Sequence, residues 1–102
     1  MVHVIATIST TSGSLAQFLE EFHRIVPLVR AETGCIEYGP TIDVETNIAG
    51  LPAVRGNVVT VVEKWDSVEA LDAHLKAPHM LRYREAVKDM VASVDIRVLR
   101  PT

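Results

Sequence analysis

The feature that constrains this chain most is a valine-rich stretch at residues 57–65. Its β-branched side chains favour extended backbone, so the sequence predicts a strand here. Side chains alternate between the two faces of a strand, which places Val59 and Val61 on one face and Val58 and Val62 on the other. Because both faces carry valines, one layer of helices cannot cover the strand, and a second sheet must cover its other face.

The remaining elements follow from apolar periodicity, since alternation predicts strands and a spacing of three to four residues predicts helices. The predicted order is a strand at 2–9, a helix from Ser14, strands at 35–44 and 57–65, helices after Asp66 and at 78–92, and a last strand around 94–99. This is the β-α-β-β-α-β order of ferredoxin-like α+β folds, with a four-stranded antiparallel sheet and the helices on one face. We expect a single domain over residues 1–102. The second apolar face predicts a twofold dimer packed sheet on sheet.

Helix boundaries are predicted from capping residues. Ser14 and Gln17 have the spacing of a capping box at the start of the first helix. Pro27 should bend that helix, and Gly34 stands where a C-terminal glycine cap is expected. Asp66 is the expected cap of the second helix. The first helix should bury a stripe made of Leu15, Phe18, Phe22, Ile25 and Val29.

Charge and composition argue against several classes of partner. Ten basic and thirteen acidic residues give a net charge of −3 without a basic run, so we expect no binding to nucleic acid. No helix has a basic polar face and no apolar run approaches the roughly 20 residues of a membrane span, so we expect no membrane association. The N-terminus has no secretory signal, which favours a cytoplasmic location. The single cysteine, Cys35, is expected to be a small buried apolar residue.

The sequence contains no strong motif for metal or nucleotide chemistry. His74 and His79 are five residues apart across Pro78, which misses the spacing of a helical zinc pair. No pair of cysteines accompanies them. The glycines do not form a phosphate-binding loop, and there is no nucleophile elbow. We therefore predict no metal site and argue against NTPases, dinucleotide enzymes and serine hydrolases.

Residues that could carry chemistry begin on the strand at 57–65. Alternation puts Asn57, Glu63 and Trp65 on one face, so the only tryptophan projects beside a carboxylate. His74 borders the apolar side of the helix that follows. Each of these has an ordinary structural alternative, with Trp65 in the core, Glu63 as a solvated charge and His74 on the helix surface.

A second histidine, His79, opens the next helical segment, and Tyr83 follows one turn later on the same side. These side chains and those above could converge on a pocket between the helices and the sheet. Aromatic residues would then supply flat apolar walls for an aromatic ligand. A histidine titrating near neutrality could take a phenolic proton. A buried carboxylate could orient that histidine or bind a substrate hydroxyl.

The stretch at residues 62–80 resembles the signature of the antibiotic biosynthesis monooxygenase family. In it, Trp65 is followed by His74 and by the pair Pro78-His79. The branch that it resembles most is that of the quinol-monooxygenase-like proteins. The resemblance implies a dimeric ferredoxin-like barrel. It also implies, for the oxygenases of the family, oxidation of an aromatic substrate by dioxygen with no cofactor of any kind.

A second match to the family is the stretch 32–35 leading to Tyr38. By resemblance, Tyr38, Trp65, His74 and His79 occupy positions that line the pocket in relatives. The partners implied are a second copy of the chain, a small aromatic substrate and dioxygen.

The match departs from the family where the reaction is concerned. Polyketide-oxidising members carry an Asn shortly before the Trp and a Tyr shortly after it, where this chain has Val61 and Leu71. Haem-degrading members need an Asn on the first strand and a His on the last helix, where this chain offers Arg82 and Arg84, so we do not expect haem degradation. The loop at 45–56 looks longer than in typical relatives and could cover the pocket or reach a second subunit.

Three functions stay open. One is an oxygenase acting on a quinol or a related polyphenol. Another is an isomerase or proton-transfer enzyme for a small phosphorylated or keto compound, which would need Arg55, Lys76 or Arg82 to reach the pocket. The third is a non-catalytic binding module in which Trp65 and its neighbours fill the pocket. The predicted site residues are His74, His79 and Glu63 as catalytic groups and Trp65, Tyr38, Tyr83 and Asn57 as substrate-binding groups.

Overall fold

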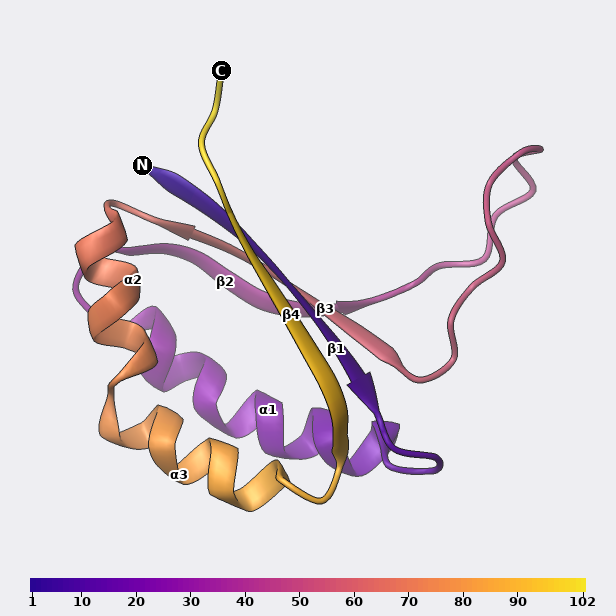
Figure 1. Cartoon of the computed structure of the whole chain (residues 1–102), viewed down its shortest axis with the longest axis horizontal. Helices are drawn as coiled ribbons and strands as arrows, with labels where there is room; N and C mark the ends of the chain where they lie inside the picture. Colours follow the sequence, from indigo (N-terminus) through magenta and orange to yellow (C-terminus); the bar gives the residue numbers. More distant parts are fainter.

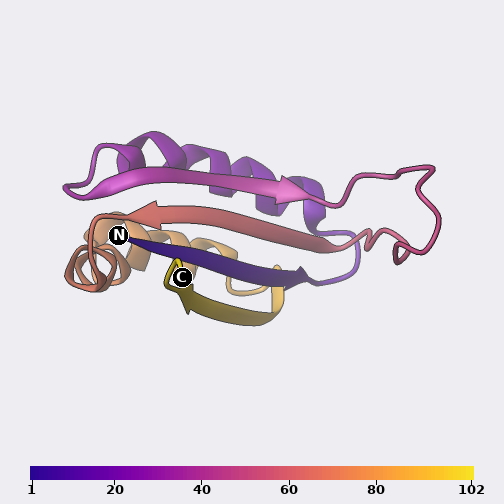
Figure 2. The ribbon, with the colours of Figure 1, turned by 90° about the horizontal axis from the view of Figure 1, so that it is seen from above.

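Four strands form one antiparallel sheet in the order β2-β3-β1-β4. The computed structural model describes the whole chain, residues 1–102. Figure 1 shows the helices gathered on one side of the sheet, and Figure 2 shows the strands side by side in this order. The predicted ferredoxin-like α+β fold is therefore confirmed. The elements are β1 (Val2–Thr10), α1 (Leu15–Arg30), β2 (Cys35–Ile42), β3 (Val58–Trp65), α2 (Val68–Leu75), α3 (Pro78–Val87) and β4 (Val91–Leu99).

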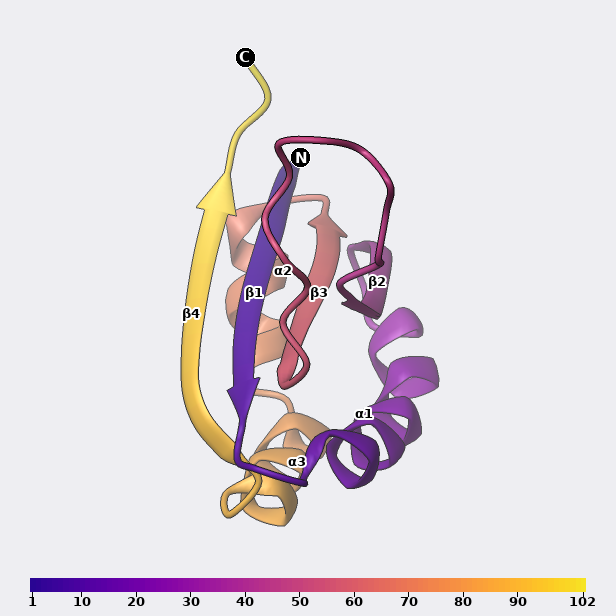
Figure 3. The same cartoon turned by 90° about the vertical axis from the view of Figure 1, so that its right-hand side faces the viewer.

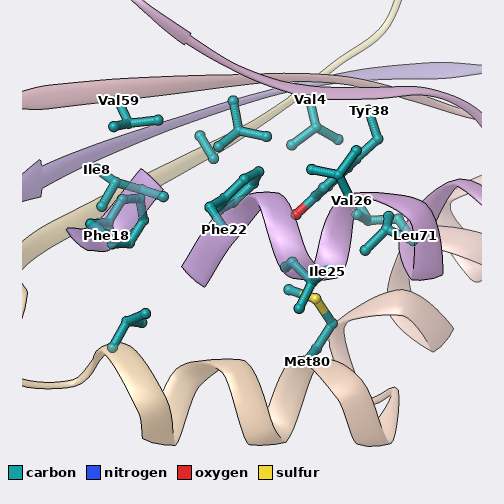
Figure 4. Close-up of a cluster of buried hydrophobic side chains, with 14 of the residues drawn as sticks. Val4, Ile8, Phe18, Phe22, Ile25, Val26, Tyr38, Val59, Leu71 and Met80 are labelled. Atoms are coloured by element: carbon teal, nitrogen blue, oxygen red, sulfur yellow. The ribbon is translucent and has the colours of Figure 1, made fainter. Parts of the chain in front are cut away.

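The core lies between the sheet and the helices, and most of its helical side chains come from α1. Along β1, Val4, Ala6 and Ile8 are buried and their neighbours are half exposed, as strand alternation predicts. The helix α1 packs Phe18 and Phe22 against this face (Figure 4). Burial of such large apolar side chains is the main force that holds the helix on the sheet. None of the helices has the length and apolarity that crossing a bilayer requires.

α1 starts where predicted, with Ser14 at the N-cap position, but its capping differs from the prediction. Ser14 has helical backbone angles (φ −96°, ψ −6°), and its side chain does not cap the helix. Its hydroxyl instead shares a 2.7 Å hydrogen bond with the hydroxyl of Thr11. The predicted capping box with Gln17 is therefore wrong, because the preceding turn offers the serine a nearer partner. The helix continues past Pro27 to Arg30.

The start of α2 lies one residue later than predicted. Ser67, not Asp66, is the cap, since its backbone is extended and its hydroxyl accepts a 3.1 Å hydrogen bond from the N–H of Ala70. The backbone N–H of Asp66 donates to the carbonyl of Gly34 at 2.8 Å. This bond ties the end of β3 to the turn before β2, so the chain leaves the sheet before the helix begins.

The last helix is shorter than predicted. It ends at Val87, so Met90 and Val91, which fall within the predicted range 78–92, lie outside it. Val91 begins β4 opposite Thr10 at the end of β1. Pairing with an existing strand satisfies the backbone of this segment and competes successfully with its helical periodicity.

The face of the sheet away from the helices carries Val58 and Val62 of β3, as predicted, and Val58 is buried. Val62 lies on it directly opposite Ile5 of β1, and both side chains are half exposed. Thr60 and Lys64 of the same strand share this face. Ile5, Val58 and Val62 thus give this face apolar side chains among polar ones, and dimerisation through this face stays a prediction.

The connection between β2 and β3 forms an arm, residues 43–57, that projects beyond the ends of the two strands (Figures 1 and 2) and lies in front of the sheet in the view of Figure 3. β2 stops at Ile42, before the predicted end at residue 44, because Asp43 turns to accept hydrogen bonds from the backbone and guanidinium of Arg55. These bonds lower the pKa of Asp43 to about 2. The arm exposes four large apolar side chains, Val44, Ile48, Leu51 and Val54.

Candidate active site

A cavity of about 320 Å³ lies between α3 and the helix-facing side of the sheet. Val94 and Ile96 of β4 line it although both are about half exposed. Their register partners on β1 are Ile8 and Ala6, which are core residues, so these β4 side chains project to the helix side as well. The helices leave this edge of the sheet uncovered, and the cavity opens there. Twelve of its fifteen lining residues are apolar.

Glu63 is the one acidic side chain that lines the cavity. It lies on β3 and is 6% exposed. Its Oε1 accepts a 2.9 Å hydrogen bond from the indole Nε1 of Trp65, which confirms that the two side chains share a face. Burial raises the pKa of Glu63 to about 7, while the bond from Trp65 acts in the opposite direction. The carboxyl group can therefore take up or release a proton near neutral pH.

Two phenols lie in the cavity wall. The ring of Tyr38 stacks on Phe22 with centroids 5.6 Å apart, and Tyr83 meets Phe22 edge to face at the same distance. Figure 4 shows the phenol oxygen of Tyr38 pointing away from the sheet. Burial raises the pKa of both phenols above the usual range, so both remain protonated and can donate hydrogen bonds.

Behind this wall, one carboxylate joins the two predicted histidines. Oε2 of Glu32 accepts a hydrogen bond from Nδ1 of His74 at 2.9 Å and from Nε2 of His79 at 2.8 Å. Glu32 lies in the turn between α1 and β2, whereas His74 ends α2 and His79 begins α3. Three separate segments thus meet at one oxygen atom.

The turn that carries Glu32 is held close to α2 by a glycine. Gly34 has φ +86°, and a Cβ placed on it would lie only 2.6 Å from the Cβ of Ala70. Only glycine permits both this backbone conformation and this close approach without strain. The contact brings the turn against α2 and so places Glu32 within reach of His74.

An ionised carboxylate only accepts hydrogen bonds, so both rings must donate to Glu32. For His74 this places the proton on Nδ1 and leaves Nε2 as an acceptor in the neutral ring. Burial lowers the pKa of His74, and Glu32 opposes that effect. The side chain is 1% exposed. The neutral tautomer with a fixed orientation is therefore favoured.

The histidine cluster (Glu32, His74 and His79) touches the cavity wall from behind. The His74 ring lies 4.6 Å from the Trp65 ring and 5.4 Å from the Tyr38 ring, measured between centroids. His74 and His79 do not themselves line the cavity. The site therefore has a cavity layer with Tyr38, Glu63 and Tyr83 and a supporting layer with the cluster and Trp65.

Other predicted site residues lie elsewhere. Trp65 is fully buried and does not line the cavity. Asn57 is exposed at the far end of β3, where its amide donates to the carbonyl of Thr10 at 3.3 Å. Cys35 is half-buried, and burial raises the pKa of its thiol. The hydrogen bond of Asn57 to Thr10 makes Asn57 a link between β1 and β3.

Sequence reasoning missed two groups of the site. One is Glu32, which lies in the stretch 32–35 that carries the family resemblance but was not predicted as a site residue. Its position beside the glycine turn at Gly34 was the signal that could have indicated its role. The cations at the cavity are Arg84 and Lys88 of α3, whereas Arg55, Lys76 and Arg82 do not line it. Helical spacing was the signal here, since Arg84 and Lys88 lie one turn apart.

The histidine cluster also contains atoms that could bind a metal. The two ring nitrogens and the carboxylate oxygen lie within 4.8 Å of one another. Two imidazoles and one carboxylate suit a divalent transition metal. In the structure these atoms satisfy one another through hydrogen bonds, and this hydrogen-bonded unit is the arrangement that supports the cavity wall.

Comparison with known proteins gives the same picture at the level of sequence and fold. The family model described as "Antibiotic biosynthesis monooxygenase" matches residues 1–86. "Probable quinol monooxygenase YgiN" of Escherichia coli K12 is 38% identical over 103 residues, covering 99% of this chain and 98% of the relative. The structure of PA3566 from Pseudomonas aeruginosa has a TM-score of 0.82 at 25% identity, covering 99% of this chain and 93% of that one. Rv0793 from Mycobacterium tuberculosis has a TM-score of 0.81 at 26% identity, covering 99% and 94%.

Proposed function

The chain belongs to the antibiotic biosynthesis monooxygenase family, and on that premise we propose that it oxidises a quinol or a related aromatic polyphenol with dioxygen. We propose further that the reaction needs neither a metal nor an organic cofactor. YgiN of Escherichia coli, which is 38% identical to this chain, is described as a probable quinol monooxygenase, and this supports the substrate class.

The observation that carries the proposal is the carboxyl group of Glu63, the one acidic group in a mostly apolar cavity. The cavity volume of about 320 Å³ lies at the lower end of the range for small-molecule sites, roughly 300–1,000 Å³. Flat aromatic side chains line it, and these suit an aromatic ring. The free volume favours a ligand-binding site over the alternative in which Trp65 fills the pocket.

In the proposed reaction, Glu63 accepts the proton of a substrate hydroxyl. The resulting anion is a much stronger reductant than the neutral quinol, and it passes electrons to dioxygen. A hydroperoxide then forms on the ring and loses water. One oxygen atom stays in the product, a hydroxyquinone, and the other leaves as water, so the substrate supplies every electron that dioxygen gains. The apolar wall keeps bulk water from the intermediate.

The histidine cluster has a positioning role in this proposal. His74 lies one side chain away from the cavity, so it acts through Trp65 and Tyr38, whose rings it touches. Trp65 in turn holds Glu63 by its indole N–H. His74 and His79, which were predicted to be catalytic, are thus proposed to support Glu63, the group that faces the substrate.

The test is oxygen consumption with a panel of hydroquinones, comparing the wild type with Glu63→Gln. Loss of a general base costs roughly 100-fold or more in kcat/KM, so we expect a loss of that size. Glu69→Gln, on the exposed surface of α2, is the matched control and should retain wild-type activity. Oxidation no faster than in buffer, or an unchanged rate in Glu63→Gln, would overturn the proposal.

We also propose that the protein works as a twofold dimer. Ile5 and Val62 at the centre of the uncovered sheet face support this, because a partner sheet would bury them. The apolar side chains of the arm support it as well, since they contact little of their own chain. Light scattering should give the mass of two chains, and Ile5→Glu should give that of one. A wild-type mass of one chain would exclude the dimer.

A second candidate function is proton transfer on a small anionic keto compound. The observation that favours it is the presence of Arg84 and Lys88 at the cavity. Turnover of such a compound without oxygen consumption would replace the monooxygenase proposal with this one.

A further inference from the structure

Arg84 is a cation at the cavity without an acidic partner. It lines the cavity from α3, and no carboxylate lies within 4.0 Å of its guanidinium. Lys88, one turn further along α3, lines the cavity too but is paired with Glu85 at 2.7 Å. Arg84 is thus the uncompensated positive charge of the site.

The guanidinium of Arg84 is held in place. Its Nη2 donates a 2.7 Å hydrogen bond to the backbone carbonyl of Leu75 at the end of α2. One nitrogen is therefore engaged, and the remaining N–H groups of the planar fork are available to a ligand. A fixed guanidinium loses less conformational entropy on binding an anion than a free one does.

The polar groups of the cavity are divided between two sides. Glu63 and Tyr38 come from the strands, while Arg84 comes from α3 and is exposed at the rim. A substrate with a phenolic hydroxyl at one end would meet Glu63. An anionic group elsewhere on that substrate would be repelled by Glu63 and attracted by Arg84.

We propose that the natural substrate of the cavity is an aromatic polyphenol that carries an anionic substituent, such as a carboxylate, bound by Arg84. The inference rests on the proposed function for the aromatic ring and on Arg84 for the anion. Guanidinium and carboxylate form paired, charge-assisted hydrogen bonds, which give orientation as well as affinity. The anion would fix the ring with its hydroxyl directed at Glu63.

The test measures binding without turnover, by calorimetry under anaerobic conditions. The two ligands are 2,5-dihydroxybenzoate and methylhydroquinone, which differ in whether the ring carries a carboxylate or a methyl group. Charge-assisted hydrogen bonds contribute enough to expect that the wild type binds the carboxylate compound roughly 10-fold more tightly. Arg84→Gln keeps a donor for the Leu75 carbonyl but has no charge, and it should lose this preference. Arg82→Gln, on the same helix but outside the cavity, should keep it.

The outcomes separate this inference from the proposed function. Equal affinity for the two compounds, no binding of either, or a preference that survives in Arg84→Gln would overturn the inference. If the preference depends on Arg84 but neither compound consumes oxygen, the anion site stands and the monooxygenase proposal fails. If both compounds are oxidised without any preference, the reverse holds.

Discussion

Glu32 and His74 are joined by a 2.9 Å hydrogen bond across 42 positions of the sequence. The bond links the turn after α1 to the end of α2, and it fixes the face that His74 presents to Trp65 and Tyr38. Because His79 donates to the same oxygen atom, one carboxylate sets the orientation of both rings. The arrangement therefore supports Tyr38 in the cavity wall and Trp65 behind it.

Glu32→Gln should therefore weaken both stability and activity. The amide carries no charge, so its oxygen is a weaker acceptor for the two ring N–H groups that now converge on one carboxylate oxygen. We expect a loss of about 1.5–3 kcal/mol in the free energy of unfolding, the range for hydrogen bonds to charged groups, and a fall in kcat/KM smaller than that of Glu63→Gln. Urea denaturation and steady-state kinetics measure the two effects. Glu37→Gln is the control, since Glu37 is exposed and lies 3.8 Å from Lys64. An equal loss of stability in Glu32→Gln and Glu37→Gln would show that the hydrogen bonds from His74 and His79 to Glu32 do not stabilise the fold.

Glu63→Gln should make the protein more stable at alkaline pH. The pKa of Glu63 rises from 4.5 to about 7 on folding, so the native state holds this proton more tightly than the unfolded state does. The stability from the protonated group is complete below pH 4.5, falls as the pH rises through 7, and is fully lost above that. The amide avoids this loss and can still accept from Trp65.

The size of the effect follows from the two pKa values, and it is on the order of 3 kcal/mol at pH 8. Urea denaturation from pH 4 to pH 8 should show the variant and the wild type diverging between about pH 4.5 and pH 7 and differing by a constant amount above that. A constant difference across this range would mean that Glu63 is not the buried group that titrates.

Gly34→Ala should be more damaging than the same change at Gly50. Both glycines have positive φ, +86° and +88°, so both variants pay for a left-handed backbone, about 1 kcal/mol. At Gly34 the new methyl group would also overlap Ala70, whereas nothing lies within 4 Å at Gly50. We expect at least twice the loss of stability for Gly34→Ala, and a partial recovery when Ala70→Gly is added. Equal losses at the two positions would show that α2 yields to the turn.

Removal of metal ions should leave activity unchanged, because the proposed reaction uses none. Protein dialysed against EDTA and checked for metal content should consume oxygen at the rate of the untreated sample. The test is a demanding one because Glu32, His74 and His79 offer three possible metal-ligating atoms close together. Activity that disappears with the metal and returns with iron or zinc would show that the cluster holds a catalytic ion.

Local patterns in the sequence were enough to predict the sheet, its helices and the shared face of Glu63 and Trp65. These features depend on strand alternation and helical spacing, which involve neighbouring residues. The boundaries were harder where two residues compete for one role. Asp66 and Ser67 are both good caps, and only the bond from Asp66 to Gly34 decides between them.

The meeting of the histidine cluster could not be predicted in this way. Glu32 reaches His74 because Gly34 allows the turn to approach Ala70, and that contact joins segments far apart in the chain. The cavity likewise exists because the helices leave Val94 and Ile96 of β4 uncovered. Such gaps arise from packing between elements and have no signature within any single element.

The most direct test of the central claim follows the fate of dioxygen. The protein is incubated with a hydroquinone under ¹⁸O₂, and the product is analysed by mass spectrometry. We expect a hydroxyquinone that contains one labelled oxygen atom, formed by the wild type and not by Glu63→Gln. An unlabelled quinone accompanied by hydrogen peroxide, or labelled product at the same rate in both proteins, would contradict it.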